Sequence, residues 1–135
     1  MRAVIDTNCL LPSIPSKNVE YWLYKSFRSK DFDWVISNDI LLEYEEKISE
    51  FYSPFTADLV INILLSASNV IRAEPFFFWN LITHDPDDNK FVDIAISANV
   101  DYLVFNDHHF NVLKNAPVFP IKVVKISEFQ KIMGY

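Results

Sequence analysis

The chain has 135 residues but only one glycine and one cysteine. Glycine usually makes up roughly 7% of a protein. Tight turns here must therefore rely on Asn, Asp, Ser and the seven prolines. The single cysteine, Cys9, excludes an internal disulfide and is typical of a reducing cytoplasm. No sequence typical of a catalytic cysteine surrounds Cys9, so we expect it to be a small buried side chain.

Positive charge is also scarce, since 12 Lys and Arg face 18 Asp and Glu and leave a net charge of −6. This balance argues against a protein that coats nucleic acid, which would normally be basic. An enzyme that acts on nucleic acid is not excluded, because metal ions can offset clustered carboxylates. No apolar run reaches the ~18 residues that a membrane span needs, and no signal peptide is visible. We therefore expect a cytoplasmic protein without membrane contact.

Half of the residues are hydrophobic and 16% are aromatic, enough for one core. We predict a single domain over residues 1–135. Strands are predicted at residues 3–5, 34–36, 69–73, 102–105 and 122–126, and helices at 19–29, 39–51, 56–68, 89–98 and after a capping Ser127. Pro12 and Pro15 predict a loop after the first strand. This alternation predicts the α/β class: a three-layer α/β/α sandwich around a mostly parallel, Rossmann-like sheet of about five strands.

Four acidic residues lie where predicted strands end or predicted helices run past the same edge of the sheet. They are Asp6, Glu43, Asp88 and Asp107. In parallel sheets, ligands bind beyond the carboxyl ends of the strands. A carboxylate beside apolar segments is costly without a partner, and Mg²⁺ and Mn²⁺ prefer oxygen ligands. The pattern predicts a divalent metal site, which can activate a water for attack on a phosphodiester.

Each acid also has an ordinary interpretation as a strand end, a helix cap or part of a solvated face. Glu43 belongs to an acidic run with Glu45 and Glu46, although its position near that of Ile40 on the helix turns it toward the sheet edge. Asp85 and Asp87 lie beside Asp88, and the choice among these three stays open. The coincidence of four acids favours the metal site.

Three segments carry a resemblance to a known family: VIDTNCLL, ISNDILLEYEEKI and HDPDDNKFVDIAISANVDYLVFNDHHF. In order and content they resemble PIN domains, which are metal-dependent ribonucleases, and most of all the prokaryotic toxins of VapC type. The resemblance covers nearly the whole chain. It implies a PIN-like fold and four catalytic, metal-binding acids, supported by two further polar residues. The acids are Asp6, Glu43, Asp88 and Asp107, and the supporting residues are Asn8 and Asp85. Phe105 departs from the pattern, since the family usually has Ser or Thr there.

Other polar residues are candidates for contact with substrate. Lys90 and His108 could contact the phosphates of an RNA, as could Lys114, because phosphate contacts position a nucleic acid. Ordinary surface lysines are an equal alternative. His84, His108 and His109 do not have the spacing of a transition-metal site, and solvated loop histidines are the favoured interpretation.

Four consecutive aromatic residues at positions 76–79 follow Pro75. The favoured interpretation is a buried connection. The alternative is an exposed surface that binds a partner or stacks on bases. Trp22, Phe76 and Trp79 are candidates for a homodimer interface.

We conclude from the sequence that the chain is a Mg²⁺- or Mn²⁺-dependent endoribonuclease that hydrolyses RNA through a metal-activated water. The resemblance implies a toxin with an antitoxin partner, and a homodimer. One alternative is a catalytically weak RNA-binding or regulatory module with the same fold. A phosphatase or phospho-receiver domain is less favoured, because no lysine follows a predicted strand end before Lys125.

Overall fold

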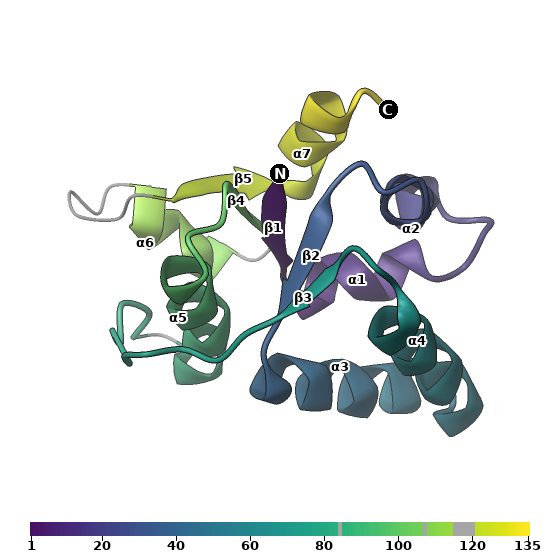
Figure 1. Cartoon of the computed structure of the whole chain (residues 1–135), viewed down its shortest axis with the longest axis horizontal. Coiled ribbons are helices and arrows are strands. Elements are labelled where there is room, and N and C mark those ends of the chain that lie inside the picture. Colours follow the sequence, from purple (N-terminus) through teal and green to yellow (C-terminus); the bar gives the residue numbers. More distant parts are fainter. Residues whose placement is uncertain (84, 107, 115–120) are drawn as a thin grey trace.

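A computed structural model of the chain contains one parallel sheet of five strands with helices packed around it (Figure 1). The structure describes residues 1–83, 85–106, 108–114 and 121–135. The strands are β1 (Arg2–Ile5), β2 (Asp33–Ile36), β3 (Val70–Arg72), β4 (Tyr102–Phe105) and β5 (Lys122–Lys125). Their order in space is β3-β2-β1-β4-β5, and every neighbouring pair is parallel. The predicted fold class is confirmed.

The helices follow the strands in alternation. They are α1 (Thr7–Ser13), α2 (Trp22–Arg28), α3 (Asn38–Phe51), α4 (Pro54–Ser66), α5 (Asn89–Ser97), α6 (Asn111–Lys114) and α7 (Ile126–Met133). Single 3₁₀ turns η1 (Val19–Tyr21), η2 (Pro86–Asp88) and η3 (His108–Phe110) precede α2, α5 and α6. In Figure 1, α5 and α6 lie on one side of the sheet and α1, α2 and α4 on the other. Among the described residues, no helix is long and apolar enough to span a membrane.

The central strand β1 explains where a site can form. Ala3, Val4 and Ile5 are fully buried, as expected for a strand covered on both faces. β1 pairs with β2 on one side and with β4 on the other. The backbone N–H of Asp6 continues this pairing and donates to the carbonyl of Val104 at 2.9 Å. The carboxyl ends of β1 and β4 therefore lie side by side.

The helix that follows β2, α3, begins at a side-chain cap. The Ser37 side chain accepts a hydrogen bond from the N–H of Ile40 at 3.2 Å, which satisfies one of the open donors of the first turn of α3. Ile40, Tyr44 and Ile48 are fully buried and lie four residues apart, so they form the inward face of α3. Glu43 precedes Tyr44 and lies at the border of this face.

Several local predictions are wrong. Pro12 lies inside α1 instead of in a loop. The proline cannot donate a hydrogen bond to the carbonyl four residues back, but only one helical residue follows it, and burial of Leu10 and Leu11 offsets the loss. Ser127 lies inside α7, whose N-cap is Lys125. Trp22 is only 7% exposed and packs against Phe129, so it offers no exposed interface.

The aromatic segment 76–79 is also not the buried connection that we favoured. Phe76, Phe77, Phe78 and Trp79 are 87%, 58%, 69% and 44% exposed. The segment crosses the surface between β3 and η2, where no other described element covers these rings.

Candidate active site

Asp6 lies at the centre of the carboxyl edge of the sheet. It directly follows β1, occupies the N-cap position of α1 and is 2% exposed. Its carbonyl accepts hydrogen bonds from the N–H groups of Cys9 and Leu10 at 2.9 and 3.2 Å, and its own N–H is bonded to β4. The backbone of Asp6 is therefore held by both the sheet and the first turn of α1.

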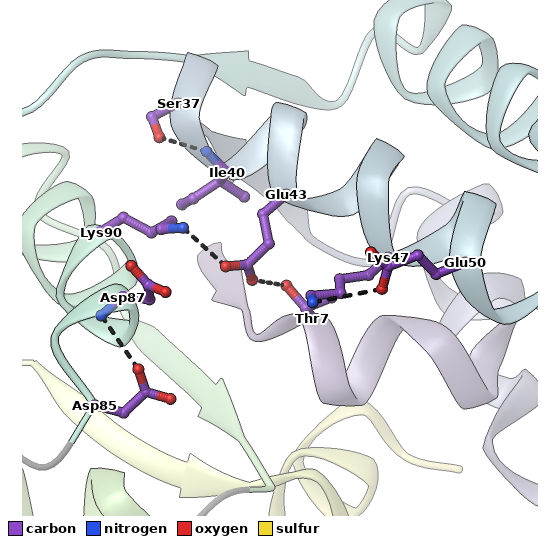
Figure 2. Close-up of polar contacts among 9 residues, drawn as sticks. All are labelled: Thr7, Ser37, Ile40, Glu43, Lys47, Glu50, Asp85, Asp87 and Lys90. Atoms are coloured by element: carbon purple, nitrogen blue, oxygen red, sulfur yellow. Dashed lines mark hydrogen bonds and ion pairs between the residues drawn. The ribbon is translucent and has the colours of Figure 1, made fainter.

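Glu43 joins three elements through its carboxylate (Figure 2). One oxygen accepts a hydrogen bond from the Thr7 hydroxyl, directly after Asp6, and the other accepts from Lys90 Nζ at 2.8 Å. The Glu43 and Lys90 side chains are 17% and 23% exposed. Glu43 thus faces the sheet edge, as its helical position predicted, and connects α3 to α1 and α5.

The surrounding carboxylates stabilise the protonated form of Lys90. Partial burial disfavours the ammonium, but the hydrogen bond and charge of Glu43, with Asp87 and Asp39 nearby, raise the pKa of Lys90 above its usual value. In the structure Lys90 is bound to the Glu43 carboxylate, and its contact with substrate stays a prediction. Its positive charge offsets part of the negative charge of the site.

A second group of side chains gathers at the start of α5. One ligand atom each of Asp85, Asp88 and His109 lies within 4.8 Å of the other two, so these residues can hold a metal ion. Asp88 Oδ2 and His109 Nδ1 lie 3.6 Å apart. Asp85 Oδ1 also accepts the N–H of Asp87 at 3.3 Å and thereby caps η2. Two carboxylates and an imidazole are a donor set that suits Mn²⁺ and other first-row ions.

His109 is a candidate that the sequence did not single out as a ligand. We favoured a solvated loop histidine, but its side chain is only 23% exposed. Its position just beyond the end of β4 was the available signal, because η3 turns the chain back toward α5. His108, the predicted substrate contact, is exposed and packs against the ring of His109 at 4.4 Å.

Other predicted residues fall into three groups. Asp107 and His84 lie outside the described residues, so the place of the fourth acid stays a prediction. Asn8 is exposed, and its side chain makes no hydrogen bond to another residue that the structure describes. Lys114 pairs with Glu128 at 3.6 Å.

Phe105 fills the position where the family pattern usually has a hydroxyl. It is 1% exposed and packs on Phe110, with ring centroids 5.3 Å apart. The side chain is part of the core instead of the site.

Cys9 cannot serve as a nucleophile in this arrangement. It is 1% exposed, and burial together with the charges of Asp6 and Glu20 raises the pKa of its thiol well above the usual value. The reactive thiolate is therefore disfavoured. The prediction that Cys9 is a buried packing residue is confirmed.

The two groups of side chains suggest what the site can do chemically. Carboxylate oxygens from several elements offer ligands for a divalent cation. Lys90 places positive charge beside them, which suits a polyanionic substrate. The arrangement therefore favours chemistry at a bound metal ion over attack by a Ser, Cys or Thr side chain.

Comparison with known proteins agrees with this arrangement. Residues 2–109 match the sequence profile of the PIN domain, a range that includes every candidate metal ligand named above. A search of curated proteins finds no match. One similar solved structure is a chain of VapBC2 from Rickettsia felis bound to a DNA fragment from its promoter, with a TM-score of 0.64, 20% identity and coverage of 93% of this chain and 98% of the other. Another is VapC20 from Mycobacterium tuberculosis, a toxin that cleaves the sarcin–ricin loop, with a TM-score of 0.63, 14% identity and coverage of 87% and 99%. At these identities the structures share the fold.

Proposed function

Because the chain belongs to the PIN-domain family, we propose that it is a metal-dependent endoribonuclease that hydrolyses RNA phosphodiester bonds. We take residues 1–135 as its single domain. One observation carries the proposal: acidic side chains from β1–α1, α3 and the η2–α5 segment converge at the carboxyl edge of the sheet. That VapC20 is described as a toxin cleaving the sarcin–ricin loop supports RNA as the substrate class.

The donor set fits a divalent cation, Mg²⁺ or Mn²⁺. The spacing within the group Asp85, Asp88 and His109 is short enough for one ion, and we assign Asp6, Glu43 and Asp107 as further acids of the site. When bound, such an ion lowers the pKa of a coordinated water and stabilises charge on the phosphate.

The remaining residues orient this set. Thr7 and Lys90 hold both oxygens of Glu43, so the Glu43 carboxylate cannot rotate freely. Lys90 also brings a cation to the rim, where it can shift from Glu43 to a substrate phosphate. His109 Nδ1 lies 3.6 Å from Asp88 Oδ2, so we count it with the candidate ligands instead of with these orienting residues. The exposed side chain of His108 is a candidate for contact with the RNA backbone.

The proposal is tested by substituting two acids without changing their shape. Asp6→Asn and Asp88→Asn should each lower RNA cleavage in the presence of Mn²⁺ by at least about 100-fold, since losing even a supporting residue of a metal site costs 10–100-fold. Asp58→Asn, on the exposed face of α4, is the matched control and should cleave normally. Circular dichroism checks that all variants fold. Full activity in both site variants would refute the assignment.

A second candidate function is an RNA-binding or regulatory module with little catalysis. Two observations speak for this second function: the apolar side chain of Phe105 and the hydrogen bond of Lys90 to Glu43. The two functions differ in metal binding. Calorimetric titration of Mn²⁺ into the wild type and Asp6→Asn separates them: absence of binding to the wild type would favour the second function.

We also propose that the chain is the toxin of a toxin–antitoxin pair, acts in the cytoplasm and forms a homodimer. The similarity to a chain of the two-component VapBC2 complex supports an antitoxin partner. If this is right, co-expression of a small protein encoded beside this gene should suppress RNA cleavage. If no small protein is encoded beside this gene, the toxin assignment fails, but the proposed nuclease activity is unaffected.

A further inference from the structure

The exposed aromatic segment 76–79 has no role in the site described so far. Its four rings are between 44% and 87% exposed, and the rings of Phe77 and Trp79 stack against each other at 4.8 Å. Exposed aromatic clusters of this kind mark surfaces that bind something.

The segment is held firmly to α5. Three side chains on successive turns of α5 accept hydrogen bonds from its backbone: Asn89 from Ile82 at 2.9 Å, Asp93 from Trp79 at 3.0 Å and Ser97 from Phe76 at 3.0 Å. Positions 89, 93 and 97 lie on one face of the helix, since they are four residues apart. The aromatic segment is therefore fixed to the helix that carries Lys90 and follows Asp88.

A pocket of about 240 Å³ lies between this segment and the candidate site. One wall is formed by Pro75, Phe78 and Asn80, and the other by Asp39, Asp87 and Lys90. Lys90 is also the partner of Glu43. Lys90 therefore lines the pocket beside the aromatic segment and also contacts Glu43 of the candidate site.

We propose that this pocket binds an unpaired base of the RNA substrate, stacked on Phe78 and hydrogen-bonded at its edge by Asp39 and Asp87. The inference rests on the proposed function. It implies that the RNA substrate is single-stranded where it lies beside the active site. Base stacking on aromatic rings is the common way in which proteins hold unpaired bases. The pocket is smaller than those for drug-sized ligands, which suits a single base.

The polar wall favours a base over a protein side chain. The core of a protein–protein interface is depleted of charged residues, whereas three carboxylates (Asp39, Asp87 and Asp93) and the ammonium of Lys90 line this pocket. Carboxylates accept hydrogen bonds from the amino groups of bases. The pocket should therefore prefer adenine, cytosine or guanine over uracil, which has no amino group.

The test compares Phe78→Ala with Phe76→Ala, because Phe76 is exposed but does not line the pocket. Affinity for a fluorescein-labelled single-stranded RNA is measured by anisotropy with a chelator present, so that cleavage does not interfere. Phe78→Ala should weaken binding by about 5- to 150-fold, the range for loss of one stacked base. Phe78→Trp should retain binding, and Phe76→Ala should bind like the wild type. In cleavage assays, Phe78→Ala should raise KM and leave kcat nearly unchanged.

A second arm tests the edge contacts. Oligonucleotides of adenine should bind the wild type more tightly than those of uracil, and Asp39→Ala should reduce that preference. Equal RNA affinity and equal KM in the wild type and Phe78→Ala would overturn the inference while leaving the nuclease intact. A change only in the protein's own oligomeric state would also overturn it, in favour of a protein interface. RNA binding that depends on Phe78 without any cleavage would instead refute the nuclease and support the pocket.

Discussion

Asp93 is a buried carboxylate whose ionisation the fold tolerates at a cost. The residue is 3% exposed, and its Oδ1 accepts the N–H of Trp79. Burial raises the pKa of Asp93 above its usual 3.8, while the Trp79 bond lowers it in part. The folded chain therefore takes up a proton at Asp93 more readily than the unfolded chain does.

The raised pKa of Asp93 predicts how the free energy of unfolding changes with pH. Ionised Asp93 costs stability at pH values above its folded pKa, and the cost disappears as the pH falls toward 3.8. Asp93→Asn keeps the acceptor and removes the charge, so it should be as stable as the wild type or more stable at about pH 7. Its advantage should shrink as the pH falls to about 4. Urea unfolding at several pH values checks this, and an advantage that grows toward acid would contradict it.

Single site residues could be predicted only in part. The positions of Asp6 and Glu43 at the sheet edge could be predicted, because strand ends and helix faces follow from local patterns. His109 was missed because its approach to Asp88 depends on how η3 turns the chain after β4. Lys90 was assigned to substrate because the sequence does not show that Glu43, 47 residues away, lies within reach of it.

The helix α3 holds the site from outside the sheet through Tyr44. The Tyr44 hydroxyl donates to the carbonyl of Ile5, immediately before Asp6, and accepts a bond from Trp34 Nε1 at 3.2 Å. Tyr44 is fully buried, and this burial raises its pKa well above the usual value, so the hydroxyl keeps its proton. The end of β1, the start of β2 and α3 are thus joined by one side chain.

Removing that hydroxyl should loosen the junction without emptying the core. Tyr44→Phe leaves the Ile5 carbonyl and the Trp34 N–H buried without this partner, which should cost about 1–3 kcal/mol of unfolding free energy. Tyr24→Phe is the control, because its hydroxyl bonds only to the exposed Arg28 side chain among the described residues, and should change stability by less than about 0.5 kcal/mol. Denaturant unfolding measures both, and equal values would show that the Tyr44 bonds contribute nothing.

Whole elements were predictable where apolar runs have clear boundaries. β4 matches its predicted residues because Asp101 and Asn106 bracket a short apolar run. α1 was missed because Pro12 is locally a breaker, and only burial of its neighbours outweighs that. The aromatic segment was misjudged because composition does not tell whether another element covers a run of rings.

The molecule as a whole carries a net charge of −6, and Asp85 and Asp88 lie together with His109 at the candidate site. Such a distribution should make the folded state respond to divalent cations. A ligand that binds only the folded state stabilises it by about 2.7 kcal/mol at 100 times its Kd.

Mn²⁺ at saturating concentration should therefore raise the melting temperature of the wild type by roughly 5–10 °C. The double variant Asp85→Asn/Asp88→Asn should lose most of this increase, whereas Asp58→Asn should keep it. Differential scanning calorimetry with and without a chelator gives the comparison. An equal increase in all three proteins would place the ion elsewhere.

At this scale the alternation of strands and helices was enough to predict the sheet and the layers around it. The prediction could not place side chains across layers, since those contacts join residues far apart in the chain. The group Thr7, Glu43 and Lys90 is an example, because it needs α1, α3 and α5 in register.

Because β1 is the central strand, the sheet edge that carries Asp6 can form only late in synthesis of the chain. Arg2 is bonded to Asp101 across 99 residues, and β1 has β4 as one of its two neighbours. A chain emerging from the ribosome carries Asp6 first, yet its pairing with Val104 has to wait until β4 has left the exit tunnel. Fragments that stop short of β4 should remain inert, so that a cell making this protein would meet its activity only after synthesis is nearly complete.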